Sequence, residues 1–261
     1  MTALIEVDSV SKAFGGLQAL NLCSFTVEAG TVAGLIGPNG SGKTTLFNVM
    51  TGYEQVRQGA VRFKGNPITN STPDRVFKLG IGRTFQLTRI FPRLTAMENM
   101  LIATQHREGW LGSVFRTVAS LGPERERAMA LLEFVGIAGL ANDAAGTLSY
   151  GQRKLLELAY VLVADPDVLL LDEPAGGVNP SLINHLAEKI RELNAQGKTF
   201  LVVEHNMEFV MNLCDAVTVM HQGSDLVAGT PAEVRSNPLV LDAYLGGGED
   251  DEDETIEAAH G

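Results

Sequence analysis

The chain has 261 residues, of which 45% are hydrophobic and 20% charged, as in an ordinary soluble globular protein. Its net charge is −11, but seven of the 31 acidic residues lie in 246–261, so the rest of the chain has a net charge of −4. This mild acidity argues against a DNA-binding surface, which normally has an excess of basic residues. The chain has only two cysteines, which excludes a disulfide framework and favours a reducing, cytoplasmic setting. No apolar run approaches the ~18 residues needed to span a membrane, so the chain is not expected to form a pore by itself, and no secretory signal is expected.

The N-terminal part of the chain, residues 3–36, is predicted to be rich in β-strand. Cys23, Phe25 and Val27 alternate with polar residues, which is the period of a half-buried strand. A short apolar strand at 31–36 runs directly into a glycine-rich loop, and a helix is predicted at 43–50. Strand, glycine loop and helix in this order are the context of a phosphate-binding loop.

The glycine-rich loop, residues 37–44, matches the pattern G-x-x-x-x-G-K-[ST] without departure. Its glycines let backbone N–H groups converge on phosphate oxygens, and the following helix N-terminus favours negative charge. Lys43 is expected to reach the β- and γ-phosphates, and Thr44 to ligate Mg²⁺. The predicted nucleotide contacts here are Gly37, Pro38, Asn39, Gly40, Ser41, Gly42, Lys43, Thr44 and Thr45. The alternative is a glycine turn with no ligand, which the flanking strand and helix disfavour.

The middle of the chain changes character. Residues 57–68 are predicted to form a hairpin, but from about 87 to 162 helical spacing replaces strand-like runs, which indicates a helical insertion. Within it, the sequence LSYGQ at 148–152 precedes a helix predicted at 153–163. Ser149 and the backbone of Gly151 then occupy a helix N-terminus, which is either an anion site or an ordinary capped start.

The core is predicted to resume at 168–171, an apolar strand typical of a parallel sheet. Asp172 follows it and is the candidate acid on the side of the metal, and Glu173 is the candidate to polarise the attacking water. The alternative is that both acids simply mark the point where the strand ends at the solvent. A helix from Pro180 and a buried strand at 199–203 continue the alternation of a parallel sheet.

The C-terminal part is predicted to contain a hairpin at 217–227 and a helix that begins at Thr230, where Thr, Pro and Glu occupy the N-cap, N1 and N3 positions. Three glycines at 246–248 lead into an acidic tail that is expected to be disordered. We therefore expect one domain over 1–245, with the helical subdomain at about 87–162 inserted in it, and a tail at 246–261.

The order and spacing of these motifs resemble those of the ATPase subunits of ABC transporters, over roughly residues 4–245. The resemblance implies an α/β fold: a P-loop ATPase core with a mainly parallel sheet, an N-terminal antiparallel β subdomain and an inserted α-helical subdomain. It implies ATP and Mg²⁺ as cofactors, with two ATP molecules held between two subunits. Ser149, Gly151 and Gln152 would then contact the ATP of the other copy.

The resemblance also implies roles for Gln86, His205 and Phe14. Without it, we would interpret them as a loop glutamine, a histidine at a strand end and a core aromatic residue. Gln86 would link Mg²⁺ and the attacking water to the membrane partner, His205 would hydrogen-bond the γ-phosphate, and Phe14 would stack on adenine. The implied catalytic set is Lys43, Gln86, Glu173 and His205, and the implied metal set is Thr44, Gln86 and Asp172. Tyr150 stands where glycine is commonest and Asn179 where Asp is usual, which leaves the details of contacts between subunits open.

Further segments are similar to the ATPases of branched-chain amino-acid importers, a group that also serves other neutral amino acids, urea and short amides. They are residues 83–86, 97–100, 177–180, 204–207, 229–231 and 243–246. This implies a peripheral protein at the cytoplasmic face of the cell membrane. Its partners would be a second ABC ATPase subunit (identical or a paralogue), two transmembrane permease subunits and, indirectly, a solute-binding protein, with no nucleic acid.

The segment 87–100 is expected to form an apolar groove for a permease helix, unless its apolar residues pack internally; they are Ile90, Phe91, Leu94 and Met97. Three other functions stay open: the ATPase of a lipid or lipopolysaccharide exporter, a soluble ABC protein acting on nucleic acid or ribosomes, and a nucleotide-binding module without turnover. The single cassette and the lack of a basic stripe disfavour the second. The solute, homodimer against heterodimer, and the role of the tail stay open.

Overall fold

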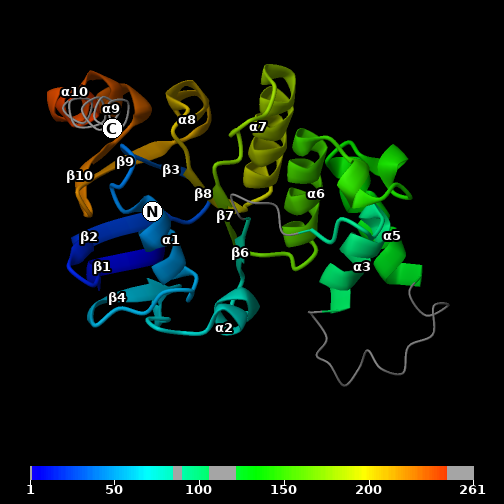
Figure 1. The fold of residues 1–261 in the computed structure, drawn as a ribbon, viewed down its shortest axis with the longest axis horizontal. Helices are drawn as coiled ribbons and strands as arrows, with labels where there is room; N and C mark the ends of the chain where they lie inside the picture. The colour runs from blue at the N-terminus through cyan, green and yellow to red at the C-terminus, as the bar shows by residue number, and fades with distance from the viewer. Residues whose placement is uncertain (1, 85–89, 106–121, 246–261) are drawn as a thin grey trace, which may run out of the picture. The chain divides into compact units, whose positions relative to one another are not determined.

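A computed structural model of the chain describes residues 2–84, 90–105 and 122–245 (Figure 1). The chain divides into two compact units, residues 1–73 with 201–261, and residues 74–200. Within the described ranges, no helix has the length and apolar character needed to cross a bilayer.

The first unit contains an antiparallel sheet in the order β2-β1-β4-β5. Its strands are β1 (Ala3–Phe14), β2 (Leu17–Glu28), β4 (Gln58–Phe63) and β5 (Asn66–Pro67). Cys23, Phe25 and Val27 of β2 are buried while their neighbours are exposed, so the predicted alternation is confirmed. The predicted hairpin at 57–68 is β4 and β5, and it turns at Lys64 and Gly65, which both have positive φ.

The rest of the first unit carries a parallel strand pair and the helices that follow it. Strand β3 (Val32–Ile36) pairs parallel with β9 (Ala216–His221), which pairs antiparallel with β10 (Ser224–Gly229), as the predicted C-terminal hairpin. Helix α1 has the predicted bounds, Lys43–Met50. The other helices are α8 (Met207–Leu213), α9 (Pro231–Ser236) and α10 (Pro238–Leu245). The predicted start of α9 is confirmed, because Thr230 and Glu233 form a capping box.

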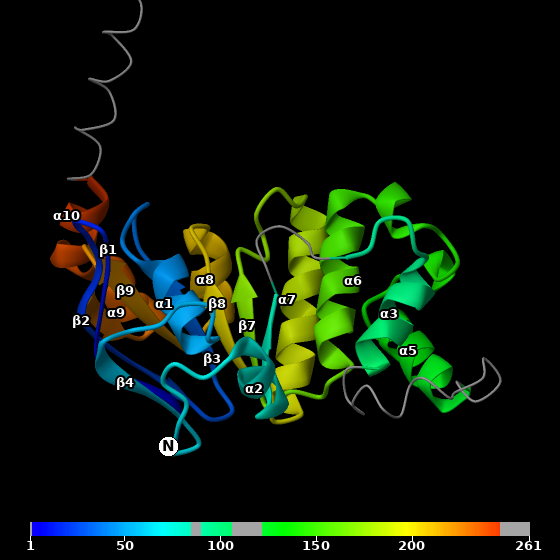
Figure 2. The same ribbon diagram turned by 60° about the horizontal axis from the view of Figure 1, so that its bottom comes forward.

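The second unit is mainly helical. It contains the parallel strands β6 (Ile81–Arg83) and β7 (Val168–Asp172), and β8 (Thr199–Val203) begins in it. Its helices are α2 (Pro73–Lys78), α3 (Ala96–Gln105), α5 (Gly122–Phe134), α6 (Tyr150–Leu162), α7 (Pro180–Ala195) and two short 3-10 helices, Ala138–Leu140 and Ala145–Thr147. Figures 1 and 2 show α3, α5 and α6 packed together.

Helix α6 begins at Tyr150, three residues before the predicted start. Ser149 is its N-cap: the Ser149 hydroxyl accepts from the amide of Gln152, and the Gln152 side chain accepts from the amide of Ser149. This reciprocal capping box satisfies two backbone donors and lets the helix start earlier. Gly151 therefore lies inside the first helical turn.

Candidate functional site

The loop at 37–44 connects β3 to α1, and glycine is required at both of its ends. Gly37 has φ +150° and Gly42 has φ +102°, values that residues other than glycine rarely adopt. A Cβ atom on Gly37 would collide with the carbonyl oxygen of Met220, and one on Gly42 would collide with the carbonyl oxygen of Ala19. The loop is thus curled tightly against β9 and β2.

The ammonium of Lys43 lies inside this curl. It donates to the carbonyl oxygens of Gly37 at 2.8 Å and Pro38 at 2.9 Å, and lies 3.3 Å from the hydroxyl of Ser41. Asn39, Gly40 and Thr44 are exposed, while Gly37 and Ser41 are buried. The loop therefore combines an ammonium with exposed residues at the N-terminus of α1, which are the elements that an anion site requires. Thr45, in the same turn of α1, is half-buried.

Two further candidates lie in the first unit. Phe14, at the end of β1, has 44% of its surface exposed, so it is not a core residue, and the ammonium of Lys12 lies over its ring. His205 follows β8 and is largely exposed, next to the fully buried Glu204. The Glu204 carboxylate accepts from the amides of His205 at 3.1 Å and Asn206 at 3.3 Å. This buried acid fixes the backbone that carries His205.

In the second unit, Asp172 ends β7 as a buried acid. Its Oδ2 accepts from the Arg83 guanidinium at 3.1 Å, and the two side chains are only 6% and 7% exposed. The amide of Asp172 donates to the hydroxyl of Thr84 at 3.2 Å, and the amide of Thr84 donates to the carbonyl of Leu170 at 2.9 Å. The end of β6 therefore holds Asp172 through both its backbone and its side chain.

Glu173 has a strained backbone. Its φ is +47°, in the left-handed region that a residue with a side chain seldom occupies. Its carbonyl accepts from the amide of Gly176 at 3.2 Å, so a tight turn follows the strand. A backbone of this kind costs about 1–3 kcal/mol. Other described residues share it, Lys64 and Asp165 among them, so it marks the turn after β7 and does not by itself mark a functional site.

The segment 148–152 has structural roles beside the predicted one. Ser149 is exposed, and Gly151 is buried where a Cβ would collide with Leu182 of α7. A Cβ atom added to Gly177 would lie 3.3 Å from the ring of Tyr150. Asn179 caps α7 by accepting from the amide of Leu182 at 3.0 Å. Asn and Asp cap helices equally well, which accounts for the departure at 179.

Some of the predicted site residues lie outside the described residues, and one was assigned to the wrong surface. Gln86 lies outside the described residues, as does the tail at 246–261. Of the predicted groove, Phe91 is 48% exposed, but Met97 is only 2% exposed, so its assignment to the groove was wrong. Met97 belongs to the buried face of α3, with Ala96, Met100 and Ala103 at helical spacing.

Comparison with known proteins decides the family. The sequence profile described as ABC transporter matches residues 20–176. The chain belongs to the ABC transporter family. This ABC cassette also matches, over 226–250, the profile described as branched-chain amino acid ATP-binding cassette transporter. The resemblance expected from the sequence motifs is therefore confirmed.

Individual relatives of the cassette cover nearly all of it. It is 42% identical to the high-affinity branched-chain amino acid transport ATP-binding protein BraF of Pseudomonas aeruginosa, over 93% of this chain and 98% of the relative. It is 40% identical to a probable branched-chain amino acid transport ATP-binding protein, LivG, of Archaeoglobus fulgidus, over 93% and 95%. A crystal structure of an ATP-binding cassette of an ABC transporter in its ADP conformation superposes with a TM-score of 0.85 and 36% identity, over 94% of this chain and 100% of the other. The α/β P-loop ATPase fold and the ATPase class are thus confirmed.

The ABC cassette offers suitable donors for Mg²⁺. Thr44 supplies an exposed hydroxyl and Asp172 a carboxylate, which are the hard oxygen ligands that Mg²⁺ prefers. The described residues contain no cluster of three or more His, Cys, Asp or Glu side chains placed to hold a metal. Each of the two groups, taken within its own unit, is of the kind that ligates Mg²⁺ together with nucleotide phosphates and water.

One buried polar group near the C-terminus was missed by the sequence analysis. The hydroxyl of Tyr244 in α10 is buried and makes no hydrogen bond to any described residue. Burial raises the pKa of the Tyr244 phenol, and the Gly37 backbone lowers it by a smaller amount. No local pattern predicts that this phenol is buried, although Tyr244 lies in the matched C-terminal segment.

Proposed function

We propose that this chain is the ATP-hydrolysing subunit of an importer of branched-chain or other neutral amino acids. The observation that carries the proposal is the second, C-terminal match at 226–250, beyond the nucleotide-binding core that all ABC cassettes share. The names of the two relatives described above support the same group. Neither the lipid-exporter alternative nor the nucleic-acid alternative has a corresponding observation.

The proposed chemistry assigns the first unit to phosphate binding and the second to water activation. Lys43 and the loop amides neutralise the phosphates, Phe14 stacks on adenine, and His205 donates to the γ-phosphate. Thr44 and Asp172 hold Mg²⁺, which when bound neutralises charge on the phosphate oxygens. Glu173 polarises the attacking water, with Gln86 as the link toward the membrane partner.

The proposed assembly is a dimer of cassettes in which each copy completes the other. Ser149, Gly151 and Gln152 at the start of α6 would contact the γ-phosphate held by the partner, and the exposure of Ser149 supports this role. The second cassette is a copy or a paralogue, and two permease subunits and a solute-binding protein complete an importer at the cytoplasmic face of the membrane. Within each copy, residues 1–245 would form one domain with the helical segment 87–162 inserted.

The test is transport by the assembled importer in proteoliposomes supplied with ATP. We expect ATP-dependent uptake of radiolabelled leucine, which excess unlabelled neutral amino acids suppress and excess urea leaves unchanged. Glu173→Gln should abolish the uptake. Uptake of urea but not leucine, or lipid movement without uptake, would overturn the proposed solute class.

A further inference from the structure

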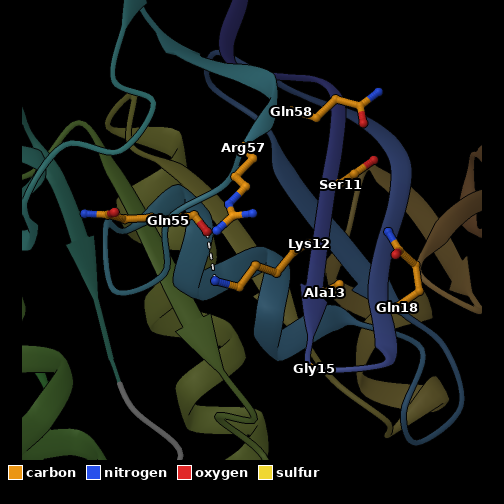
Figure 3. A pocket seen from close by; sticks show the side chains of 8 residues that line it. All are labelled: Ser11, Lys12, Ala13, Gly15, Gln18, Gln55, Arg57 and Gln58. Carbon is orange, nitrogen blue, oxygen red and sulfur yellow. Dashed lines mark hydrogen bonds between the residues drawn. The ribbon is translucent and has the colours of Figure 1, made fainter.

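Lys12 of β1 is held at three points in the first unit. Its ammonium donates to the carbonyl oxygen of Gln55 at 2.8 Å, pairs with Oε2 of Glu54 at 2.8 Å, and lies 4.8 Å from the ring centroid of Phe14. The Lys12 side chain is only 17% exposed. Figure 3 shows it reaching from β1 to Gln55. An ammonium held in this way is not a free surface charge.

The Lys12 ammonium lies over the ring of Phe14. Phe14 is the last residue of β1, just before the turn at Gly15, and 44% of its surface stays exposed. The ammonium covers one face of the ring and leaves area for a second partner. A cation over an aromatic face attracts it more strongly when the cation is partly desolvated, as Lys12 is.

The same contacts connect the aromatic residue to the phosphate loop. Glu54 and Gln55 come shortly after α1, whose first residue is Lys43. Gly42, at the start of α1, packs against Ala19 and Leu20 of β2, the strand that pairs with β1. Lys12 therefore joins the end of the β1–β2 hairpin to the segment that leaves the phosphate-loop helix.

A pocket of about 550 Å³ lies beside Lys12 and offers no competing surface for stacking (Figure 3). It is lined by Ser11, Lys12, Ala13, Gly15, Gln18, Gln55, Arg57 and Gln58. None of these residues is aromatic, and Phe14 is not among them. Because the Lys12 ammonium is already paired with Glu54 and donates a hydrogen bond to the carbonyl oxygen of Gln55, Lys12 is poorly suited to bind a phosphate itself.

We propose that Lys12 is a positioning residue for the nucleotide base: with Glu54 and Gln55 it holds the Phe14 ring in the orientation in which a purine stacks on the open face. This rests on the proposed role of Phe14. A ring held in place before binding loses less freedom when the base stacks, so the support appears as affinity for the base and not for the phosphates.

The test compares ADP, which has a base, with pyrophosphate, which has none, by calorimetric titration of the full-length protein. We expect Lys12→Met to weaken ADP binding about three- to tenfold and to leave pyrophosphate binding within about twofold. Lys12→Arg keeps a cation over the ring and should bind ADP almost as tightly as the wild type. In a Phe14→Ala background, Lys12→Met should have no further effect on ADP.

A matched control is Lys64→Met, because the Lys64 ammonium lies 5.3 Å from the ring centroid of Phe63, which is only 2% exposed and presents no open face. It should change neither affinity. If Lys12→Met fails to fold, Glu54→Gln tests the same support and should weaken ADP selectively. Equal losses for ADP and pyrophosphate, or none for ADP, would overturn the inference. An unchanged ADP affinity in Phe14→Ala would instead overturn the stacking role of Phe14.

Discussion

The buried ion pair between Arg83 and Asp172 makes a quantitative prediction for Arg83→Met. The variant leaves the Asp172 carboxylate buried without its guanidinium, with both original side chains at most 7% exposed. Removing one partner of a buried pair lowers the free energy of unfolding by about 3–5 kcal/mol. For a chain of this size, about 2–4 °C of melting temperature per kcal/mol gives a loss of about 6–20 °C.

The assay is thermal unfolding followed by circular dichroism. The matched control is Lys78→Met, which breaks the pair of Lys78 with Asp74; their side chains are 64% and 74% exposed, so the pair contributes at most about 0.5 kcal/mol. The double variant Arg83→Met with Asp172→Asn removes both charges and should recover part of the loss. If Arg83→Met unfolds within 2 °C of the wild type, or Asp172→Asn gives no recovery, the pair does not hold the end of β7 as described.

Three further predictions concern packing and buried thiols. Gly151→Ala should lower the free energy of unfolding by no more than about 1 kcal/mol, because the added methyl meets only the movable Cδ2 of Leu182 and alanine favours the helix; a loss above about 3 kcal/mol in a denaturant titration would contradict this. Asn99→Leu should loosen residues 91–95, since the buried Asn99 amide bonds the backbone of Phe91, Leu94 and Thr95; faster hydrogen exchange there would show it, and unchanged exchange would contradict it. Burial raises the pKa of Cys23 and Cys214 from 9.0 to about 12, so neither thiol should react with a thiol reagent at pH 8 until denaturant is added. Because the folded pKa is the higher one, the thiols' contribution to stability is complete below pH 9 and is lost as the pH rises toward 12.

Local patterns sufficed for several elements of the structure. The period of β2 and the bounds of α1 follow from alternation and from the glycine loop, which act over a few residues. The start of α6 was placed three residues late because the reciprocal cap between Ser149 and Gln152 was not used. Met97 was misplaced because an apolar residue near an expected groove carries no mark of which helix face it occupies.

Other features of the site depend on contacts between distant residues. Arg83 and Asp172 are 89 positions apart, and only the parallel pairing of β6 with β7 brings them together. The left-handed backbone of Glu173 is imposed by the turn to Gly176, and no residue-type preference at 173 indicates it. Glycine at 151 looked like part of an anion site, whereas its burial against Leu182 gives a packing reason as well.

The central claim of the proposed function is that each cassette needs a second one to form a working ATPase. The most direct measurement is the molar mass of Glu173→Gln in solution with Mg²⁺ and ATP, by sedimentation or light scattering, alone and mixed with its paralogue. The account predicts a dimer with ATP, a monomer with ADP, and a monomer when Ser149→Arg is added to Glu173→Gln. If the Glu173→Gln protein stays strictly monomeric with ATP at high concentration, both alone and when mixed with its paralogue, the result would contradict the account.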